Sequence, residues 1–216
     1  MNDLFDSLPD TRSARMPIAE GAVLLCGLAR QSEPELIAAL REVIAAAPFR
    51  HMVTPGGHRM SVAMTSCGAV GWVTDRSGYR YAPTDPDSGQ PWPTMPASFR
   101  ELARNAAAQA GFDDFDPDSC LINRYKPGAK MALHQDKDER DFAAPIVSVS
   151  LGLPATFLFG GLARSDKPKR FQLEHGDVVA WGGPARLAYH GVAPLKDGTH
   201  PQLGPQRINL TFRKAC

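Results

Sequence analysis

The sequence contains few cysteines and no long apolar run. Four of its 216 residues are cysteine, and no two of them form a Cys-x-x-Cys pair. This spacing argues against a disulfide scaffold or a cysteine-rich zinc site, and it fits a reducing compartment. The most apolar stretch, residues 21–29, is much shorter than the roughly 20 residues that a membrane-spanning helix needs. The N-terminal segment is acidic where a signal peptide would be basic. We therefore expect a cytoplasmic protein with no membrane partner.

An excess of charge of one sign is also missing. The chain carries 24 Lys and Arg residues against 23 Asp and Glu residues, for a net charge of +1. Any contact with nucleic acid must therefore come from a local basic face. With 43% hydrophobic and 22% charged residues, the composition is that of a soluble globular protein. We expect a leader segment over residues 1–20, a single domain over 21–216, and a monomer, because no pattern indicates a large apolar interface.

Two stretches have the periodicity of amphipathic helices. Over residues 33–47, apolar side chains recur every three or four positions, and Ser32 and Glu35 have the spacing of a capping box. A second apolar stripe covers residues 97–110 and ends before a glycine, which is typical of helix C-termini. Both stripes are interpreted as core faces. Residues 48–96 between them are rich in Pro, Gly, Thr and aromatic residues.

The chain after residue 119 consists of short β-branched or aromatic segments separated by Gly, Pro or Asp turns, which is typical of strands. No helical pattern interrupts them, so parallel βαβ winding is excluded and two packed antiparallel sheets of four strands are expected. The predicted fold class is mainly β with flanking helices (α+β): a double-stranded β-helix, or cupin-like jelly roll, with an N-terminal helical extension. The eight expected strands are 120–126, 130–135, 145–151, 155–159, 169–174, 177–181, 187–192 and 206–213.

His134 and Asp136 are two positions apart in an expected strand. Side chains at i and i+2 point to the same face of a strand, so an imidazole and a carboxylate project side by side. His190, near the end of another strand segment, offers a third ligand. Two histidines and one carboxylate on one face of a metal are the arrangement of non-haem Fe(II) oxygenases, with open positions for a cosubstrate and O2. On these residues alone, a structural role for the histidines is an equal alternative.

The C-terminal segment 207–213 alternates between apolar and polar side chains. Its apolar face must be core, and its other face carries two arginines. A guanidinium can bind a carboxylate bidentately, which favours a small dicarboxylate ligand. A solvated outer strand face is the open alternative. The polar residues are Arg207, Asn209, Thr211 and Arg213, and the same alternation is seen at Asn123 and Tyr125.

A series of motifs runs along the chain in a fixed order. The motifs are Leu121-Ile-Asn-Arg-Tyr125, Gly128 followed by His134-x-Asp136-x-Asp138, Ser148-Val-Ser-Leu-Gly152, Phe159-Gly-Gly161, Glu174-His-Gly-Asp177, Tyr189-His-Gly191 and Arg207-x-Asn-Leu-Thr-Phe-Arg213. In this order they resemble the AlkB family of Fe(II)/2-oxoglutarate dioxygenases. The segments 52–57 and 60–64 are similar to bacterial members of that family. The resemblance covers residues 20 to 213, nearly the whole chain.

The resemblance implies direct reversal of alkylation damage in DNA, preferably single-stranded, with RNA open as a further substrate. In that family, Fe(II), 2-oxoglutarate and O2 are used to oxidise a methyl group on a base nitrogen, as in 1-methyladenine or 3-methylcytosine. The hydroxymethyl product breaks down to formaldehyde and the restored base, and succinate and CO2 are released. Two alternatives stay open: an oxygenase with a substrate other than nucleic acid, and a non-catalytic nucleic-acid-binding jelly roll.

The resemblance also implies roles for individual residues. Residues 119–213 would form the catalytic jelly-roll core, with a nucleotide-recognition region over 48–96. The iron ligands would be His134, Asp136 and His190. Arg213 with Tyr125 would clamp the distal carboxylate of 2-oxoglutarate. The partners of its metal-chelating end would be Arg207 and Asn123, with Asn209 and Thr211 lining the pocket.

For the damaged base, the resemblance implies that Trp72 stacks on a flipped nucleotide, with His134 on the opposite side. Removing a base from the stack costs a few kcal/mol, least when methylation already prevents pairing, and stacking on an aromatic ring returns about 1–3 kcal/mol. Asp138 would read an exocyclic amino group and favour a cationic base. The other implied substrate residues are Tyr79, Arg80, Tyr81 and Arg164, with the role of Arg80 open because the family carries an apolar residue there.

Overall fold

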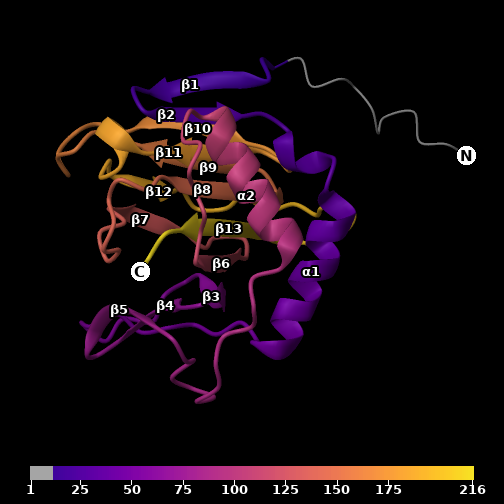
Figure 1. Ribbon diagram of the computed structural model, residues 1–216, viewed down its shortest axis with the longest axis vertical. Helices are drawn as coiled ribbons and strands as arrows, with labels where there is room; N and C mark the ends of the chain where they lie inside the picture. The colour runs from indigo at the N-terminus through magenta and orange to yellow at the C-terminus, as the bar shows by residue number, and fades with distance from the viewer. Residues whose placement is uncertain (1–11) are drawn as a thin grey trace, which may run out of the picture.

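The protein is described by a computed structural model over residues 12–216. Two antiparallel sheets form its centre (Figure 1). The larger sheet has the order β1-β2-β11-β8-β13-β6-β3, and the smaller has the order β10-β9-β12-β7. The strands of the larger sheet are β1 (Arg15–Ala19), β2 (Ala22–Leu25), β3 (Ala63–Gly68), β6 (Ser119–Tyr125), β8 (Ile146–Gly152), β11 (Val178–Trp181) and β13 (Arg207–Arg213). Those of the smaller sheet are β7 (Met131–His134), β9 (Ala155–Phe159), β10 (Lys169–Leu173) and β12 (His190–Val192).

The eight strands expected after residue 119 are all present and divide equally between the two sheets. β6, β8, β11 and β13 lie side by side in the larger sheet, while β7, β9, β10 and β12 make up the smaller one. Every residue of β8 and β13 is buried, because these strands have neighbours on both edges and are covered on both faces. The predicted jelly roll is therefore confirmed.

N-terminal strands widen the larger sheet beyond the four strands expected. β1 pairs with β2, and β2 pairs with β11. The loose leader expected over residues 1–20 is therefore wrong for residues 15–19, which form an edge strand, while residues 1–11 lie outside the described residues. Arg12 ties this end to the core, because its guanidinium donates to both carboxylate oxygens of buried Asp177 at 2.7 and 2.9 Å.

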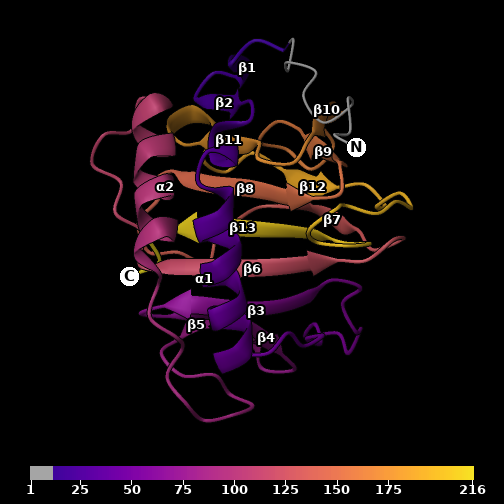
Figure 2. The same ribbon diagram turned by 90° about the vertical axis from the view of Figure 1, so that its right-hand side faces the viewer.

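Both predicted helices form and cover the same face of the larger sheet (Figure 2). They are α1 (Glu33–Ala46) and α2 (Ala97–Gln109). Phe99 of α2 packs edge to face on Phe212 of β13, with ring centroids 6.1 Å apart. Ser32 is the N-cap of α1, but its side chain makes no capping hydrogen bond, so the predicted capping box is wrong. No helix within residues 12–216 is long and apolar enough to cross a membrane.

The region between the helices contains a separate hairpin, placed beyond β3 at the bottom of Figure 1. Its strands are β4 (Gly71–Asp75) and β5 (Gly78–Ala82), which pair antiparallel. Gly71 has to be glycine, because a Cβ at this position would overlap the indole ring of Trp92. The close approach of Gly71 to Trp92 fixes the position of the start of β4. It thereby also positions Trp72, the next residue and one of the expected substrate residues.

Candidate metal centre

His134, Asp136 and His190 come together where β7 and β12 pair. The two histidines are direct cross-strand partners, and Asp136 follows two residues after β7 ends. Nε2 of His134 lies 3.6 Å from Oδ1 of Asp136, and Nε2 of His190 lies 3.9 Å from Oδ2. The ligand atoms all lie within 4.8 Å of one another. One metal ion, at the roughly 2.1 Å typical of imidazole and carboxylate ligands, can therefore contact all three.

The hydrogen bonds of the two imidazoles orient them for coordination. Nδ1 of His134 lies 2.9 Å from the carbonyl oxygen of Ala132, and Nδ1 of His190 lies 3.0 Å from that of Ala188. Because a carbonyl only accepts, each Nδ1 carries the proton and each Nε2 keeps a lone pair for a metal. Burial, together with the nearby His134, lowers the pKa of His190 to about 4. His190 is therefore neutral near pH 7, as a metal ligand must be.

Asp136 is buried but stays ionised, because Arg213 donates to it and the two ligand histidines lie beside it. Arg213 donates from Nε and Nη2 to Oδ2 of Asp136 at 2.9 and 2.6 Å. Burial by itself would raise the pKa of Asp136, but Arg213, His190 and His134 outweigh burial and hold this pKa well below its usual range. The group thus offers one anionic and two neutral ligands, the donor set of a non-haem Fe(II) centre.

A cavity between the two sheets, the inner cavity, borders His134 and His190. Buried polar atoms in its wall have no hydrogen-bond partner among the described residues, including Nη1 of Arg207 and of Arg213. Buried donors without acceptors are costly, and a dicarboxylate would supply those acceptors, so the residues present fit 2-oxoglutarate. The cavity is lined by all six residues expected to hold that cosubstrate: Asn123, Tyr125, Arg207, Asn209, Thr211 and Arg213.

The two arginines are arranged differently from the expectation. Tyr125 pairs across the strands with Arg207, whose guanidinium lies 5.1 Å from the centre of the tyrosine ring. Arg213 stands at the other end of β13, roughly 20 Å away at about 3.3 Å per residue, where it contacts Asp136. Arg213 and Tyr125 both line the inner cavity, but the contacts of each are with other residues, so their joint clamp stays a prediction. Arg207 is the neighbour of Tyr125, and Arg213 is the neighbour of the metal ligand.

A second pocket, the outer pocket, also borders His134 and Asp136. Trp72 donates its indole N–H to Oδ2 of Asp138 at 2.8 Å and stacks on Tyr79, with ring centroids 5.6 Å apart. An aromatic face, a carboxylate and a ligand histidine are thus gathered around one opening. The expected substrate residues that line it are Trp72, Tyr79, Asp138 and Arg164.

Arg80 and Tyr81, also expected to contact the nucleotide, are not part of the outer pocket lining. Arg80 forms an ion pair with Asp75 of the same hairpin, at 2.7 Å. The hydroxyl of Tyr81 donates to Glu139 at 2.6 Å. Both side chains are therefore engaged with other protein groups, and the structure provides no support for a base contact by either.

The sequence patterns did not predict two buried charged residues that lie beside the metal centre. Glu139 and Arg186 are 6% and 3% exposed. Glu139 stands in the run Lys137-Asp-Glu-Arg140, which is typical of a solvated loop, and Arg186 stands alone among apolar neighbours. Neither belongs to a motif with a spacing that predicts chemistry. The outer pocket is also lined by three methionines that no sequence pattern marked as site residues: Met60, Met64 and Met131.

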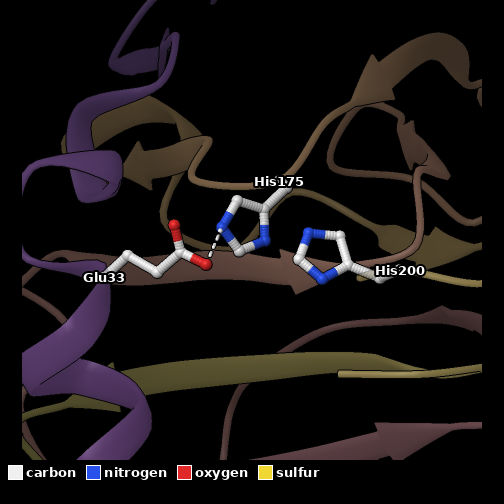
Figure 3. A group of neighbouring side chains, drawn as sticks. All are labelled: Glu33, His175 and His200. Atoms are coloured by element: carbon white, nitrogen blue, oxygen red, sulfur yellow. Dashed lines mark ion pairs between the residues drawn. The ribbon is translucent and has the colours of Figure 1, made fainter. Parts of the chain in front are cut away.

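A second group of two histidines and a carboxylate is formed by Glu33, His175 and His200 (Figure 3). Nε2 of His175 lies 3.1 Å from Oε1 of Glu33. However, Nδ1 of His175 accepts the backbone N–H of Gly152 at 2.9 Å, so the proton of the neutral ring sits on Nε2. The two rings are stacked at 24°, and in-plane lone pairs of nearly parallel rings do not converge on one ion. The group is a polar contact that joins the start of α1 to the end of β8.

Comparison with known proteins agrees with this geometry. The family model described as the 2OG-Fe(II) oxygenase superfamily matches residues 21–213. The chain is 58% identical over 212 residues to the alpha-ketoglutarate-dependent dioxygenase AlkB of Escherichia coli (strain K12), covering 98% of both chains. It is 34% identical over 174 residues to the DNA N(6)-methyladenine demethylase ALKBH1C of Arabidopsis thaliana, covering 68% of this chain and 38% of the relative.

Among solved structures, the one titled "The structure of OsALKBH1" superposes with a TM-score of 0.79 at 31% identity, over 93% of this chain and 99% of the other. The chain therefore belongs to the AlkB family of the 2OG-Fe(II) oxygenase superfamily. It is an Fe(II)/2-oxoglutarate-dependent dioxygenase, and the predicted requirement for Fe(II), 2-oxoglutarate and O2 is confirmed at the level of the family.

Proposed function

We propose that this protein demethylates N-alkylated bases, of the 1-methyladenine and 3-methylcytosine type, in DNA and also in RNA. One observation carries the proposal: the inner cavity and the outer pocket meet at His134 and Arg213. The inner cavity has the charge and the unpaired donors for a dicarboxylate, while the outer pocket has an aromatic face for a base. The similarity to a DNA demethylase of Arabidopsis and to AlkB of E. coli supports nucleic acid as the substrate class.

His134, Asp136 and His190 would hold Fe(II) on one face. Bound there, the metal would activate O2 with 2-oxoglutarate as the electron donor, yielding succinate, CO2 and an oxidised methyl group that leaves as formaldehyde. The chain itself orients the reactants. Arg207 beside Tyr125 would bind the distal carboxylate of 2-oxoglutarate, and Arg213 would lie at its chelating end. This exchanges the roles of the two arginines relative to the sequence-based expectation.

Trp72 would hold the damaged base by stacking, with His134 across the outer pocket. A base methylated on its pairing edge is cheaper to flip out than a paired one. Asp138 accepts the Trp72 indole through one carboxylate oxygen, so its other oxygen can accept from an exocyclic amino group. Its negative charge also favours a cationic methylated base over the neutral product. Tyr79 and Arg164, both exposed at the rim, would contact the sugar-phosphate backbone.

Several finer points belong to the same proposal. Single-stranded substrate would be preferred, because a base outside a duplex needs no unpairing before it enters the pocket. Residues 21–216 would act as one catalytic domain, since all residues that line the two pockets fall in this range, and the protein would act as a monomer. The scattered free cysteines support a reducing, cytoplasmic location.

The deciding experiment is formaldehyde release from a single-stranded oligonucleotide containing one 1-methyladenine, with and without Fe(II) and 2-oxoglutarate. The unmethylated oligonucleotide of the same sequence is the matched control. Trp72→Ala should weaken binding of the methylated strand about 5- to 150-fold, equivalent to about 1–3 kcal/mol of stacking, while Trp72→Phe retains most of it. 2-Oxoglutarate turnover that no methylated DNA or RNA stimulates would refute the nucleic-acid assignment and leave an oxygenase for another substrate.

A further inference from the structure

Asp136 lies in a segment that has no regular secondary structure of its own. Residues 135–145, which connect β7 to β8, form neither helix nor strand. A metal ligand has to be held within a few tenths of an ångström, which requires support from neighbouring groups. Most of the segment is exposed, but Asp136 and Glu139 are buried, and buried polar groups must find partners here outside a strand ladder. Both requirements lead to one side chain, Arg186.

Arg186 binds the segment at its beginning, middle and end. Its Nη1 donates to the carbonyl oxygen of Asp136 at 2.8 Å, and its Nε donates to that of Ala144 at 2.9 Å. Its Nη2 donates to Oε2 of Glu139 at 3.1 Å. Arg186 directly follows the 3-10 turn Gly183–Ala185 and stands four residues before His190. One planar guanidinium with fixed donor directions thus holds the loop of one metal ligand against the chain that carries another.

Glu139 balances the second arginine of the centre. Its Oε1 lies 3.4 Å from Nε of Arg213 and also accepts the hydroxyl of Tyr81 at 2.6 Å. Two arginines and two carboxylates, all nearly buried, therefore form one neutral network. Buried charges are stable only when paired. Without the charge of Glu139, Asp136 alone would balance two guanidiniums and would be a poorer ligand for a dication.

We propose that Arg186 and Glu139 are positioning residues of the metal centre, which act on the metal through Asp136. Arg186 fixes the backbone of Asp136, and Glu139 shares Arg213 with it. Neither side chain lines the inner cavity or the outer pocket, so both are expected to act on the metal through Asp136. This inference rests on the metal centre of the proposed function but not on its nucleic-acid substrate.

The test is Fe(II) affinity under anaerobic conditions, together with the visible absorption of the Fe(II)–2-oxoglutarate chelate. Arg186→Met and Glu139→Gln should each weaken Fe(II) binding roughly 10- to 100-fold, the usual effect of removing a partner of a metal ligand, and should shift the absorption band. Arg186→Lys and Glu139→Asp, which keep the charges, should restore part of the affinity. The KM for 2-oxoglutarate, measured at saturating Fe(II), should change less than kcat.

Two controls separate this inference from general destabilisation and from failure of the metal centre. Asp177→Asn breaks the buried ion pair with Arg12 and should lower the thermal midpoint without changing Fe(II) affinity. His134→Ala should weaken Fe(II) binding by more than about 100-fold, beyond the effect of losing a partner of a ligand. Where Arg186→Met does not fold, Arg186→Lys and Glu139→Gln decide. Folded variants that bind Fe(II) like the unmodified protein, beside a His134→Ala that does not, would overturn the inference alone. Unchanged binding in His134→Ala would overturn the metal centre itself.

Discussion

Two groups of two histidines and one carboxylate occur in this molecule, and distance does not tell them apart. In both, the ligand atoms lie within 4.8 Å of one another and the two imidazole centroids are 4.4 Å apart. They differ in what holds the rings. In the centre at His134 and His190, carbonyl oxygens hold Nδ1 and the rings are tilted by 52°. In the group at His175 and His200, backbone N–H groups hold Nδ1 and the rings are stacked at 24°.

This difference shows that the groups behind the ligands decide whether a cluster can bind a metal. A carbonyl behind Nδ1 forces the proton onto that nitrogen and frees Nε2, whereas a backbone N–H behind Nδ1 forces the proton onto Nε2. The surroundings differ as well. Asp136 and His190 are buried beside two pockets, while Glu33, His175 and His200 are all partly exposed.

The largest expected contrast is in metal binding. His134→Ala should weaken Fe(II) binding by more than about 100-fold, beyond the effect of losing a mere partner of a ligand. His200→Ala should leave it unchanged, because its ring does not point its lone pair at a shared ion. Anaerobic Fe(II) titration of both variants measures the contrast. An equal loss in His200→Ala would remove the distinction between the two groups.

A pH titration of the metal-free protein provides the next contrast. The folded-state pKa of His190, about 4, lies below the 6.5 that is ordinary for histidine. A lowered pKa contributes stability above pH 6.5 that is lost as the pH falls toward 4, because the unfolded chain then binds the proton first. The loss should reach about 3 kcal/mol in the free energy of unfolding. Urea unfolding at several pH values should show this slope, and His190→Gln should flatten it.

Arg207 supplies a positive charge in the inner cavity, beside Tyr125. Replacing it tests the cosubstrate site that borders the centre at His134 and His190. Arg207→Met should raise the KM for 2-oxoglutarate about 10- to 150-fold, since a hydrogen bond to a charged group contributes about 1.5–3 kcal/mol. Fe(II) affinity without the cosubstrate should stay the same. Steady-state turnover at varied 2-oxoglutarate gives the result, and an unchanged KM would contradict the placement of the distal carboxylate beside Tyr125.

The second group should matter for stability and not for chemistry. Glu33→Gln removes the carboxylate charge that lies 3.1 Å from Nε2 of His175. It should lower the free energy of unfolding by at most about 1 kcal/mol, with no change in Fe(II) affinity or turnover. Thermal unfolding at pH 7 is the measurement. A loss of activity without a loss of stability would show that this group has a functional role.

The smallest effect is a proton position. In the metal-free protein, the neutral forms of His134 and His190 should carry their proton at Nδ1, and that of His175 should carry it at Nε2. Nitrogen-15 NMR of the side chains distinguishes the two tautomers. The same tautomer in all three residues would contradict the hydrogen-bond argument that separates the groups.

Local patterns in the sequence predicted a large part of this protein. Short β-branched or aromatic segments between turn residues identified the eight jelly-roll strands. Period-two alternation identified the polar face of 207–213, since alternation places side chains on faces whatever the strand pairs with. Period-three-to-four apolar spacing identified both helices. The His134-x-Asp136 spacing predicted two metal ligands, and the ordered motifs identified the family. The role of each predicted site residue remains a prediction.

Tertiary structure decided the rest, because it depends on contacts between residues far apart in the chain. Strand register placed Tyr125 beside Arg207. The guanidinium of Arg213 instead contacts Asp136, which lies 77 positions earlier in the chain. Sheet closure brought Arg186 to the loop of Asp136, where no spacing rule links the two. The same closure built a second histidine pair that resembles the metal centre in composition. Only the partners of each Nδ1, supplied by backbone groups of the folded chain, determine which pair can hold a metal.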